Sequence, residues 1–247
     1  DPKTNGPAPY SKDNVPYHPK HWAPVSLQGY KQGDFSMTMG YPGSTSRYLS
    51  SYGIRERRDA LNAPRAQVRG VKQDVMTRHM RASEAVRIKY DSKFAQSANY
   101  WKNSIGMNKC IDSIGLIAQK QRYEDIIRHW QDSTSYLKGQ LDFVKMARLY
   151  NERFETRKAA MYFQETFLRT NELTDRALKA LTSMTKKDKK GDYVTFADNS
   201  NTWDAALDKE VQAVLLKNYR EHVAPEYLPA FYKIIDQKCH GDYKRYV

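Results

Sequence analysis

Apolar residues recur at three- and four-residue spacing along most of the chain, and this spacing predicts amphipathic helices. The first pattern predicts a helix from about Pro64 to about Tyr90, because proline suits the first turn of a helix. A second pattern begins at Ile105 and ends near Trp130. A third, from about Ser133 to Arg169, would form a helix roughly 55 Å long at about 1.5 Å per residue. Helices of that length favour an elongated bundle.

The remainder of the chain carries shorter periodic segments. The expected elements are a short helix over 173–181, a loop over 186–200, and final helices over 203–219 and 226–238. We expect Asn201 or Thr202 to cap the helix that begins at Trp203, because their side-chain oxygens accept hydrogen bonds from free backbone N–H groups.

The N-terminal region shows a different pattern. Six of the ten prolines fall within residues 1–34, which favours loops and extended backbone. Apolar and polar residues then alternate over Phe35–Met39, the period of a half-buried strand, and Tyr41–Ser44 supplies turn chemistry. Val25–Leu27 is a weaker strand candidate. Because an isolated hairpin is marginally stable in water, we expect this strand to need a further sheet to pack on.

The change of period after Gly53 predicts two regions. Residues 1–53 form a loop and strand fragment with a junction, and residues 54–247 form a helical domain that is incomplete at its C-terminal end. The predicted fold class is therefore mainly α: an elongated multi-helix bundle preceded by a short β fragment. The first residues contain neither an initiator methionine nor an apolar signal core, so we expect an excised piece of a longer protein.

Three strings carry a resemblance to a known family. Gly40–Gly53, with the sequence GYPGSTSRYLSSYG, resembles a segment of the bacterial trypsin-like serine dipeptidyl-peptidase family. Tyr10–Tyr17 and Ser97–Gly106 resemble two further segments of the same family. The resemblance is strong over residues 10–106 and rests on pattern alone from there to Val247. It implies a double β-barrel peptidase domain interrupted by a helical insertion, and this chain would supply the insertion and a fragment of the first barrel.

The resemblance also implies where the catalytic groups lie. A serine-peptidase triad needs a nucleophilic serine, a histidine base and an acidic residue that orients the histidine. In the family, the histidine and the acid precede a segment like this one and the serine follows it. Asp1 does not match the position of the acid. We therefore expect no catalytic residue in this chain, and we expect the isolated chain to be inactive although its parent would be a serine-type dipeptidyl-peptidase hydrolase.

One substrate contact is expected inside the chain. A dipeptidyl-peptidase recognises the free α-ammonium of its peptide substrate, and an ammonium group needs oxygen acceptors such as a carboxamide or a carboxylate. The resemblance implies that Asn99 supplies one such oxygen. The alternative is that Asn99, Tyr100 and Trp101 form a helix junction whose aromatic rings only pack. Arg47 is expected either to pair with an acidic group at the domain junction or to lie on the surface.

The charge balance supports a second hypothesis. The formal net charge is +13, so the chain would suit a non-enzymatic basic helical module that binds nucleic acid or an anionic membrane. Such a module should gather its basic residues on one face. Between Arg55 and Arg87 the basic residues scatter, apart from a partial stripe of Arg58, Arg65, Arg69 and Lys72. This scatter favours the peptidase hypothesis, which involves no nucleic acid. The chain also lacks a run of 18 apolar residues that would span a membrane.

Histidine and cysteine give little sign of metal chemistry. His18 and His21 lie three residues apart in a proline-rich loop without further ligands nearby, so we expect a surface loop, no metal and no cofactor. Cys110 and Cys239 are expected to be ordinary thiols, and a disulfide between them stays open. The resemblance implies a periplasmic or cell-surface location, a homodimeric parent, the barrel domain as an intramolecular partner, and peptides with a free N-terminus as substrates.

Overall fold

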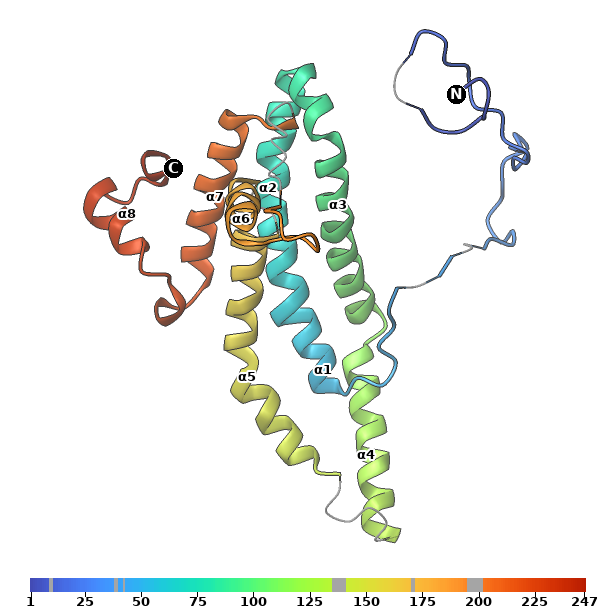
Figure 1. Ribbon diagram of the computed structural model, residues 1–247. Coiled ribbons are helices and arrows are strands. Elements are labelled where there is room, and N and C mark those ends of the chain that lie inside the picture. The colour runs from blue at the N-terminus through green and yellow to red at the C-terminus, as the bar shows by residue number, and fades with distance from the viewer. Residues whose placement is uncertain (9–10, 38–39, 42, 135–140, 170–171, 195–201) are drawn as a thin grey trace. The chain divides into compact units, whose positions relative to one another are not determined.

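The structure is a computed structural model that describes residues 1–8, 11–37, 40–41, 43–134, 141–169, 172–194 and 202–247 (Figure 1). It contains two compact units, Asp1–Thr45 and Ser46–Val247. This boundary lies before residues 46–53, which the sequence pattern assigns to the first region. The two units are described separately below.

The described part of the first unit consists of loops and turns. Asn5 and His18 close a loop in its first part, because the Asn5 carboxamide donates to the His18 carbonyl at 2.7 Å and accepts from the His18 N–H at 3.0 Å. The strand expected over Phe35–Met39 is not formed at residues 35–37, where Phe35 is 89% exposed and Met37 is 68% exposed. Residues 38–39 lie outside the described residues. The physical reason is that no other described segment offers these residues a backbone partner.

The second unit begins with one long helical path. It runs through α1 (Ser51–Arg55), the π-helical segment η1 (Glu56–Asn62) and α2 (Ala63–Ala82). The helix expected over 64–90 therefore starts earlier and ends earlier than the pattern predicts. It ends because Ser83 takes an extended conformation, with φ −144° and ψ 120°, and its side chain caps the next helix by accepting from the Val86 N–H.

The chain then returns antiparallel to α2. Helix α3 (Glu84–Ser113) packs along α2, and α4 (Leu116–Thr134) continues in nearly the same direction (Figure 1). The two are separated at Gly115, whose φ of +59° is accessible to glycine at low cost. This break divides the single helix that the pattern predicts up to Trp130.

Helix α5 is shorter than expected. It spans Phe143–Phe163 and passes into the π-helical segment η2 (Gln164–Leu168). Asp142 starts α5 by accepting from the Lys145 N–H at 2.8 Å, so the helix begins ten residues after Ser133, which itself belongs to α4. Residues 135–140 of the predicted helix lie outside the described residues. Helix α6 (Glu172–Thr185) follows, and it confirms the expected short helix.

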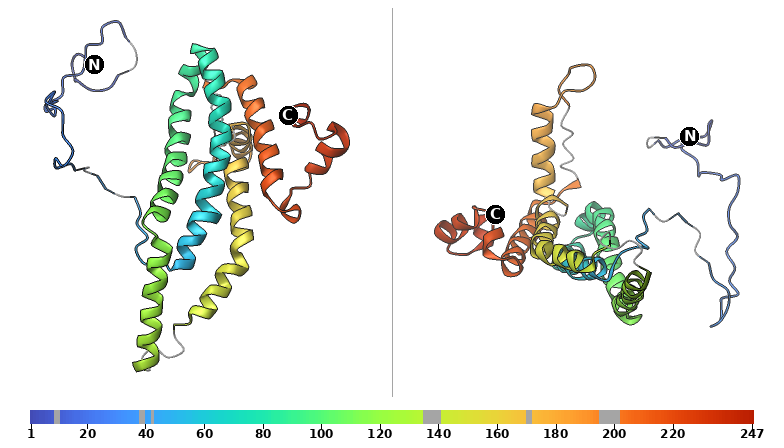
Figure 2. Two further views of the ribbon diagram at one scale, coloured as in Figure 1. Left: turned by 180° about the vertical axis from the view of Figure 1, so that it is seen from behind. Right: turned by 90° about the horizontal axis from the view of Figure 1, so that it is seen from below.

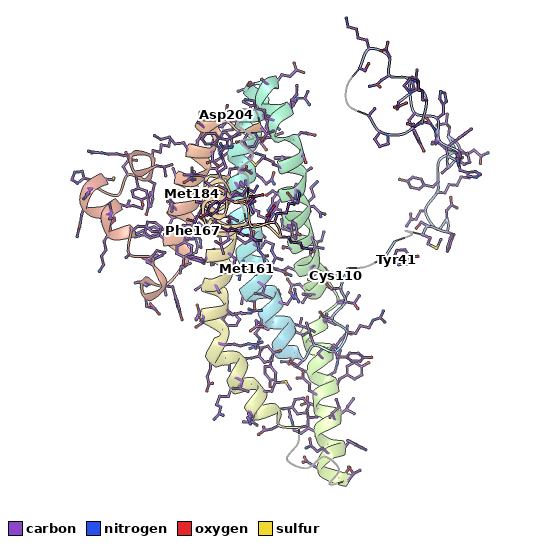
Figure 3. The ribbon with its side chains drawn as sticks, viewed as in Figure 1. Tyr41, Cys110, Met161, Phe167, Met184 and Asp204 are labelled. Carbon is purple, nitrogen blue, oxygen red and sulfur yellow. The ribbon has the colours of Figure 1, made fainter. Side chains whose placement is uncertain are left out.

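The C-terminal helices begin at caps that the sequence pattern did not identify. Helix α7 (Ala205–His222) is capped by Asp204, labelled in Figure 3, and not by Thr202. Asn201 lies outside the described residues. The helix expected over 226–238 is divided into the 3₁₀ turn η4 (Pro225–Tyr227) and α8 (Tyr232–Cys239). The division follows from Pro229, which lacks an N–H and disfavours a helical conformation at Leu228. A last short helix, α9, spans Tyr243–Tyr246.

The core of the second unit lies where α2 meets α3, α5 and α7 (Figures 1 and 2). Its most buried apolar side chains are Val68, Met76, Tyr90, Leu207, Val211, Leu215, Tyr219 and Ile235. In Figure 2, α6 projects away from this row of helices. The mainly α fold class is confirmed.

Two contacts join α1, at the start of this unit, to helices α4 and α5, which come much later in the sequence. The buried carboxylate of Glu124 on α4 accepts from the backbone N–H of Ser51 at 2.6 Å and from its hydroxyl at 2.7 Å. Gly53 approaches Tyr150 of α5 so closely that an added Cβ would lie 2.9 Å from the Tyr150 hydroxyl oxygen. The last glycine of the string Gly40–Gly53 therefore has a packing role inside α1.

We expect Glu124→Ala to destabilise the chain by about 1–3 kcal/mol, because two buried donors of Ser51 lose their acceptor. Urea unfolding followed by circular dichroism measures this free energy. Glu155→Ala is the matched control, because the Glu155 carboxylate is exposed and lies 4.0 Å from Lys158. Equal unfolding free energies for the two variants would contradict the structural role of Glu124.

Candidate functional site

Helix α3 presents two different faces over residues 96–103. Ser97 and Ala98 are buried against the bundle, whereas Asn99 is exposed, with exposed Gln96 and Asn103 about one turn to either side. Within the described part of the chain, no side chain hydrogen-bonds to the Asn99 carboxamide. Its oxygen is therefore accessible to a donor from outside the bundle.

The two aromatic residues after Asn99 pack on α2. The Arg69 guanidinium lies over the Tyr100 ring, 4.7 Å from its centroid. The Trp101 indole nitrogen would lie 3.4 Å from a Cβ added at Gly70. Asn99 itself lies inside α3, so the segment is not a helix junction. The rings of Tyr100 and Trp101 therefore pack against the bundle, as the alternative interpretation expects. The Asn99 carboxamide takes no part in this packing and stays accessible.

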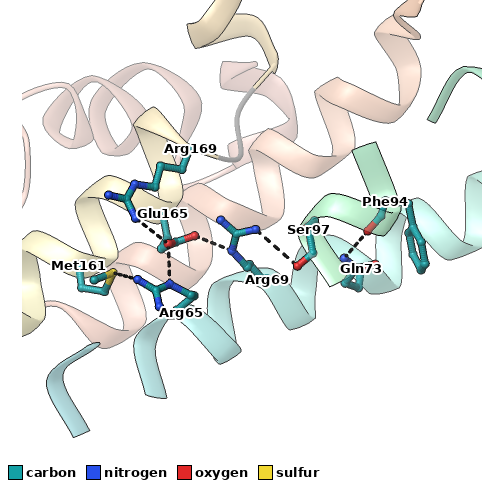
Figure 4. Close-up of polar contacts among 8 residues, drawn as sticks. All are labelled: Arg65, Arg69, Gln73, Phe94, Ser97, Met161, Glu165 and Arg169. Atoms are coloured by element: carbon teal, nitrogen blue, oxygen red, sulfur yellow. Dashed lines mark hydrogen bonds and ion pairs between the residues drawn. The ribbon is translucent and has the colours of Figure 1, made fainter. Parts of the chain in front are cut away.

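Behind this face lies a buried ionic cluster centred on Glu165 (Figure 4). The π-helical segment η2 carries Glu165 into the bundle, where its side chain is fully buried. Its carboxylate contacts three arginines, with N–O distances of 3.0 Å to Arg65, 2.7 Å to Arg69 and 3.8 Å to Arg169. Arg69 also donates to the Ser97 carbonyl at 3.4 Å, so the same guanidinium connects α2, η2 and α3.

Lys72 lies one helical turn beyond Arg69 on α2 and is also buried. Burial lowers the pKa of Lys72 to about 8. Asp208 of α7 is buried as well, and burial raises the pKa of its carboxyl group. Gln212 donates to the Asp208 carboxylate at 3.0 Å. The interior of the bundle therefore holds charges from three helices.

These burials bear on the basic stripe of Arg58, Arg65, Arg69 and Lys72. Arg69 is 5% exposed and Lys72 is 6% exposed, so neither side chain can contact a phosphate backbone at the surface. Arg58 pairs with Asp59 and Asp112, each at 2.8 Å. The stripe is directed to partners inside the protein, and it offers no continuous surface for nucleic acid.

The other candidate residues belong to other segments of the chain. Arg47 is exposed, and its carbonyl accepts from the Lys120 amine at 3.0 Å. His18 and His21 are exposed, and among the described residues no three His, Cys, Asp or Glu side chains converge as metal ligands. Cys110 and Cys239 are both free, with Cys110 exposed on α3 (Figure 3).

The sequence pattern misses the ionic cluster because its partners are far apart in sequence. Glu165 lies 96 residues from Arg69 and 100 from Arg65. The available signal is the spacing of Arg65, Arg69 and Lys72, which places three cations on one side of α2. Spacing alone does not say whether that side is exposed or buried.

Comparisons with known proteins cover the whole chain. A family model described as Peptidase S46 matches residues 1–247. The chain is 39% identical to Dipeptidyl-peptidase 7 of Porphyromonas gingivalis, over 98% of this chain and 34% of that protein. It is 30% identical to an Asp/Glu-specific dipeptidyl-peptidase of the same organism, over 99% of this chain and 36% of that protein. The chain thus spans about a third of the length of these curated relatives.

A solved structure supports the same relationship. The crystal structure of Porphyromonas endodontalis DPP11 in complex with the dipeptide Arg-Glu matches with a TM-score of 0.69 and 28% identity. The match covers 99% of this chain and 36% of that chain. Separately, none of the described helices is both long enough and apolar enough to cross a membrane.

We expect Lys72→Met to change the pH dependence of stability. The pKa of Lys72 is about 8 in the folded chain, against an ordinary value of 10.5. Between these values the unfolded chain binds more protons at this residue, so the native chain gains stability as the pH rises. Methionine does not titrate, and the variant loses this gain, which is on the order of 1–3 kcal/mol.

Urea unfolding at pH 7 and pH 10 measures the difference between wild type and variant. Other titrating groups occur in both chains, so the difference isolates Lys72. The control is Lys102→Met, because Lys102 is exposed on α3. If the free energy of unfolding rises by the same amount between pH 7 and pH 10 in wild type and in Lys72→Met, the lowered pKa of Lys72 is refuted.

Proposed function

The chain belongs to the peptidase S46 family, and we propose from this that it is the helical domain of a serine dipeptidyl-peptidase that releases dipeptides from free peptide N-termini. The proposal is supported by the names of the relatives, which are dipeptidyl-peptidases. The chain corresponds to about a third of those proteins, so the activity is proposed for the longer protein. The catalytic serine, histidine and acid would come from its remaining sequence.

The proposed role of the helical domain is to cover the catalytic cleft and to help select unblocked N-termini. A cap that closes over a substrate excludes water and completes the binding site. Asn99 is the residue that we assign to the α-ammonium contact. The observation that carries this assignment is an accessible carboxamide on a helix whose opposite face is held by buried contacts.

The physical fit of Asn99 to this task is specific. An α-ammonium has three N–H donors and no acceptor, so a carboxamide oxygen can accept one of them. Arg69 holds α3 from the inside through the Ser97 carbonyl and the Tyr100 ring. These contacts limit rotation of α3 and fix the position of the Asn99 backbone. A preorganised acceptor costs less entropy on substrate binding than one on a loop.

Three further features of the longer protein are proposed from the family relationship alone. The protein is exported to the periplasm or the cell surface, it forms a homodimer, and the barrel domain is the intramolecular partner of the helices. The residue preferred at the second substrate position is set by the barrel, outside this chain.

We expect Asn99→Ala in the full-length enzyme to lower kcat/KM for dipeptidyl chromogenic substrates by roughly 10- to 150-fold, the equivalent of one charge-assisted hydrogen bond. Asn103→Ala is the control, because Asn103 is exposed on the same helix one turn away. The comparison is repeated with substrates whose N-terminus is acetylated. Asn99→Ala should reduce the ratio of kcat/KM for substrates with a free N-terminus to kcat/KM for acetylated substrates. An unchanged ratio would contradict the ammonium contact.

We expect the isolated chain to show no hydrolysis of the same chromogenic substrates, because its proposed catalytic groups lie elsewhere in the longer protein. The full-length enzyme at equal concentration is the positive control. Hydrolysis by the purified chain that a serine-directed inhibitor abolishes would refute this assignment of the triad.

A further inference from the structure

A cavity of about 340 Å³ lies beside the Glu165 cluster and is open to solvent on one side, where its lining residues Gln96, Tyr100 and Arg169 are exposed. Its residues come from α2, from α3, from Arg169 directly after η2, and from the first residue of α6. Its lining residues are Arg69, Lys72, Lys93, Gln96, Ser97, Tyr100, Arg169 and Glu172. Neither the catalytic proposal nor the α-ammonium contact uses this cavity, since Asn99 does not line it.

The charge of the cavity wall is mainly positive. Four of the eight lining residues are cations and one is a carboxylate. Glu165 pairs with Arg69 and Arg169 of the lining, Arg65 pairs with Glu165, and Asp208 acts electrostatically on Lys72. With these three residues added, the described residues of the cluster comprise five cations and three carboxylates, an excess of two positive charges. Buried ions are costly unless they are paired, and Arg69 and Lys72 are buried, so an anion in the cavity would lower this cost.

Several donors face the same space. The bonds that Arg69 makes to Glu165 and Ser97 use Nε and Nη1, so its Nη2 group is left for another acceptor. Arg169 contacts Glu165 only at 3.8 Å, and its side chain is about half exposed. Lys93 donates to Glu172 at 2.8 Å and to the Thr202 carbonyl at 2.9 Å, so two of its three N–H groups are used.

Ser97 provides an independent sign of a ligand. Its side-chain oxygen is buried and makes no hydrogen bond within the described part of the chain, although the residue lines the cavity. A buried hydroxyl without a partner is unfavourable, because it has lost its hydrogen bonds to water and gained none. A bound acceptor would satisfy this hydroxyl and the cations at the same time.

We propose that this cavity binds a small doubly charged oxyanion, with Arg69, Lys72, Arg169 and the Ser97 hydroxyl as its donors. Two negative charges balance the excess charge of the cluster. The volume exceeds the roughly 30 Å³ of one water molecule several times over, so it accommodates phosphate, sulfate or a short dicarboxylate. These ligands share the same oxyanion chemistry, and the experiment separates them.

Isothermal titration calorimetry of the full-length protein tests the proposal. The probes are inorganic phosphate, sulfate and succinate, each titrated at constant ionic strength against a sodium chloride reference. The expected result is saturable binding of at least one probe. Phosphate or sulfate binding identifies a tetrahedral oxyanion, whereas succinate binding alone identifies a dicarboxylate. No saturable binding of any probe refutes the proposal.

Two variants locate the binding. Lys72→Met should weaken the probe by at least about tenfold, because it removes a charged donor, and Ser97→Ala should weaken it several-fold. Lys102→Met, an exposed lysine of α3 outside the lining, should bind like wild type. Circular dichroism of each variant establishes that it is folded. Unchanged affinity in both Lys72→Met and Ser97→Ala would assign the binding to another site and overturn the proposal.

The calorimetric measurement does not involve catalysis. A loss of the anion site therefore leaves the dipeptidyl-peptidase proposal intact, and a failure of that proposal leaves the anion site intact. The helical domain would thereby have a ligand of its own, bound beside Ser97 and Tyr100 on the same helical turn as Asn99, the residue that we assign to the substrate ammonium.

Discussion

The buried carboxylate of Glu165 is the interaction on which the arrangement of the helices depends. It holds two arginines of α2, and one of these, Arg69, also reaches the backbone and an aromatic ring of α3. A single carboxylate thus couples η2 to two consecutive helices, α2 and α3, that precede it by many residues in sequence. Replacing it would leave the guanidinium groups of Arg65 and Arg69 without this counter-charge at positions largely shielded from water. Such a change costs more than the loss of one surface ion pair.

The π-helical segments explain how the long helices direct these charges inward. A π-helical turn contains more residues than an α-helical turn, so the side chains that follow it point in a different direction than they would in a regular α-helix. Segment η2 carries Glu165 into the bundle, and η1 carries Glu56, which receives two hydrogen bonds from Arg153 of α5 at 2.7 and 2.8 Å. Each of the two π-helical segments therefore carries a carboxylate that pairs with an arginine from another helix.

The hydrophobic period predicts that helices dominate the fold, and it predicts their approximate positions. It fails at their ends, because Ser83, Asp142 and Asp204 begin new helices through single side-chain hydrogen bonds that leave no periodic signal. It also fails at Phe35–Met39. Alternating apolar and polar residues show that a segment could form a β-strand, but a strand also needs a neighbouring strand to pair with. Within the candidate site, the choice of Asn99 comes from the resemblance and stays a prediction, because the hydrophobic pattern does not single this residue out. The Glu165 cluster is missed because its pairing crosses about a hundred residues.

The net charge of +13 is likewise a poor guide to function, because a sum over the sequence does not distinguish buried cations from exposed ones. It counts Arg69 and Lys72 as equal to exposed lysines, although these two are directed into the interior. Residues 97–100 show what this arrangement achieves. Their inner side provides Ser97 and Tyr100 to the cationic cavity, and their outer side presents Asn99. Because both sides belong to one helical turn, any change in charge compensation inside the cavity acts on the same backbone that positions Asn99. The interior charges of this domain are thus connected to its exposed face through the rigidity of α3.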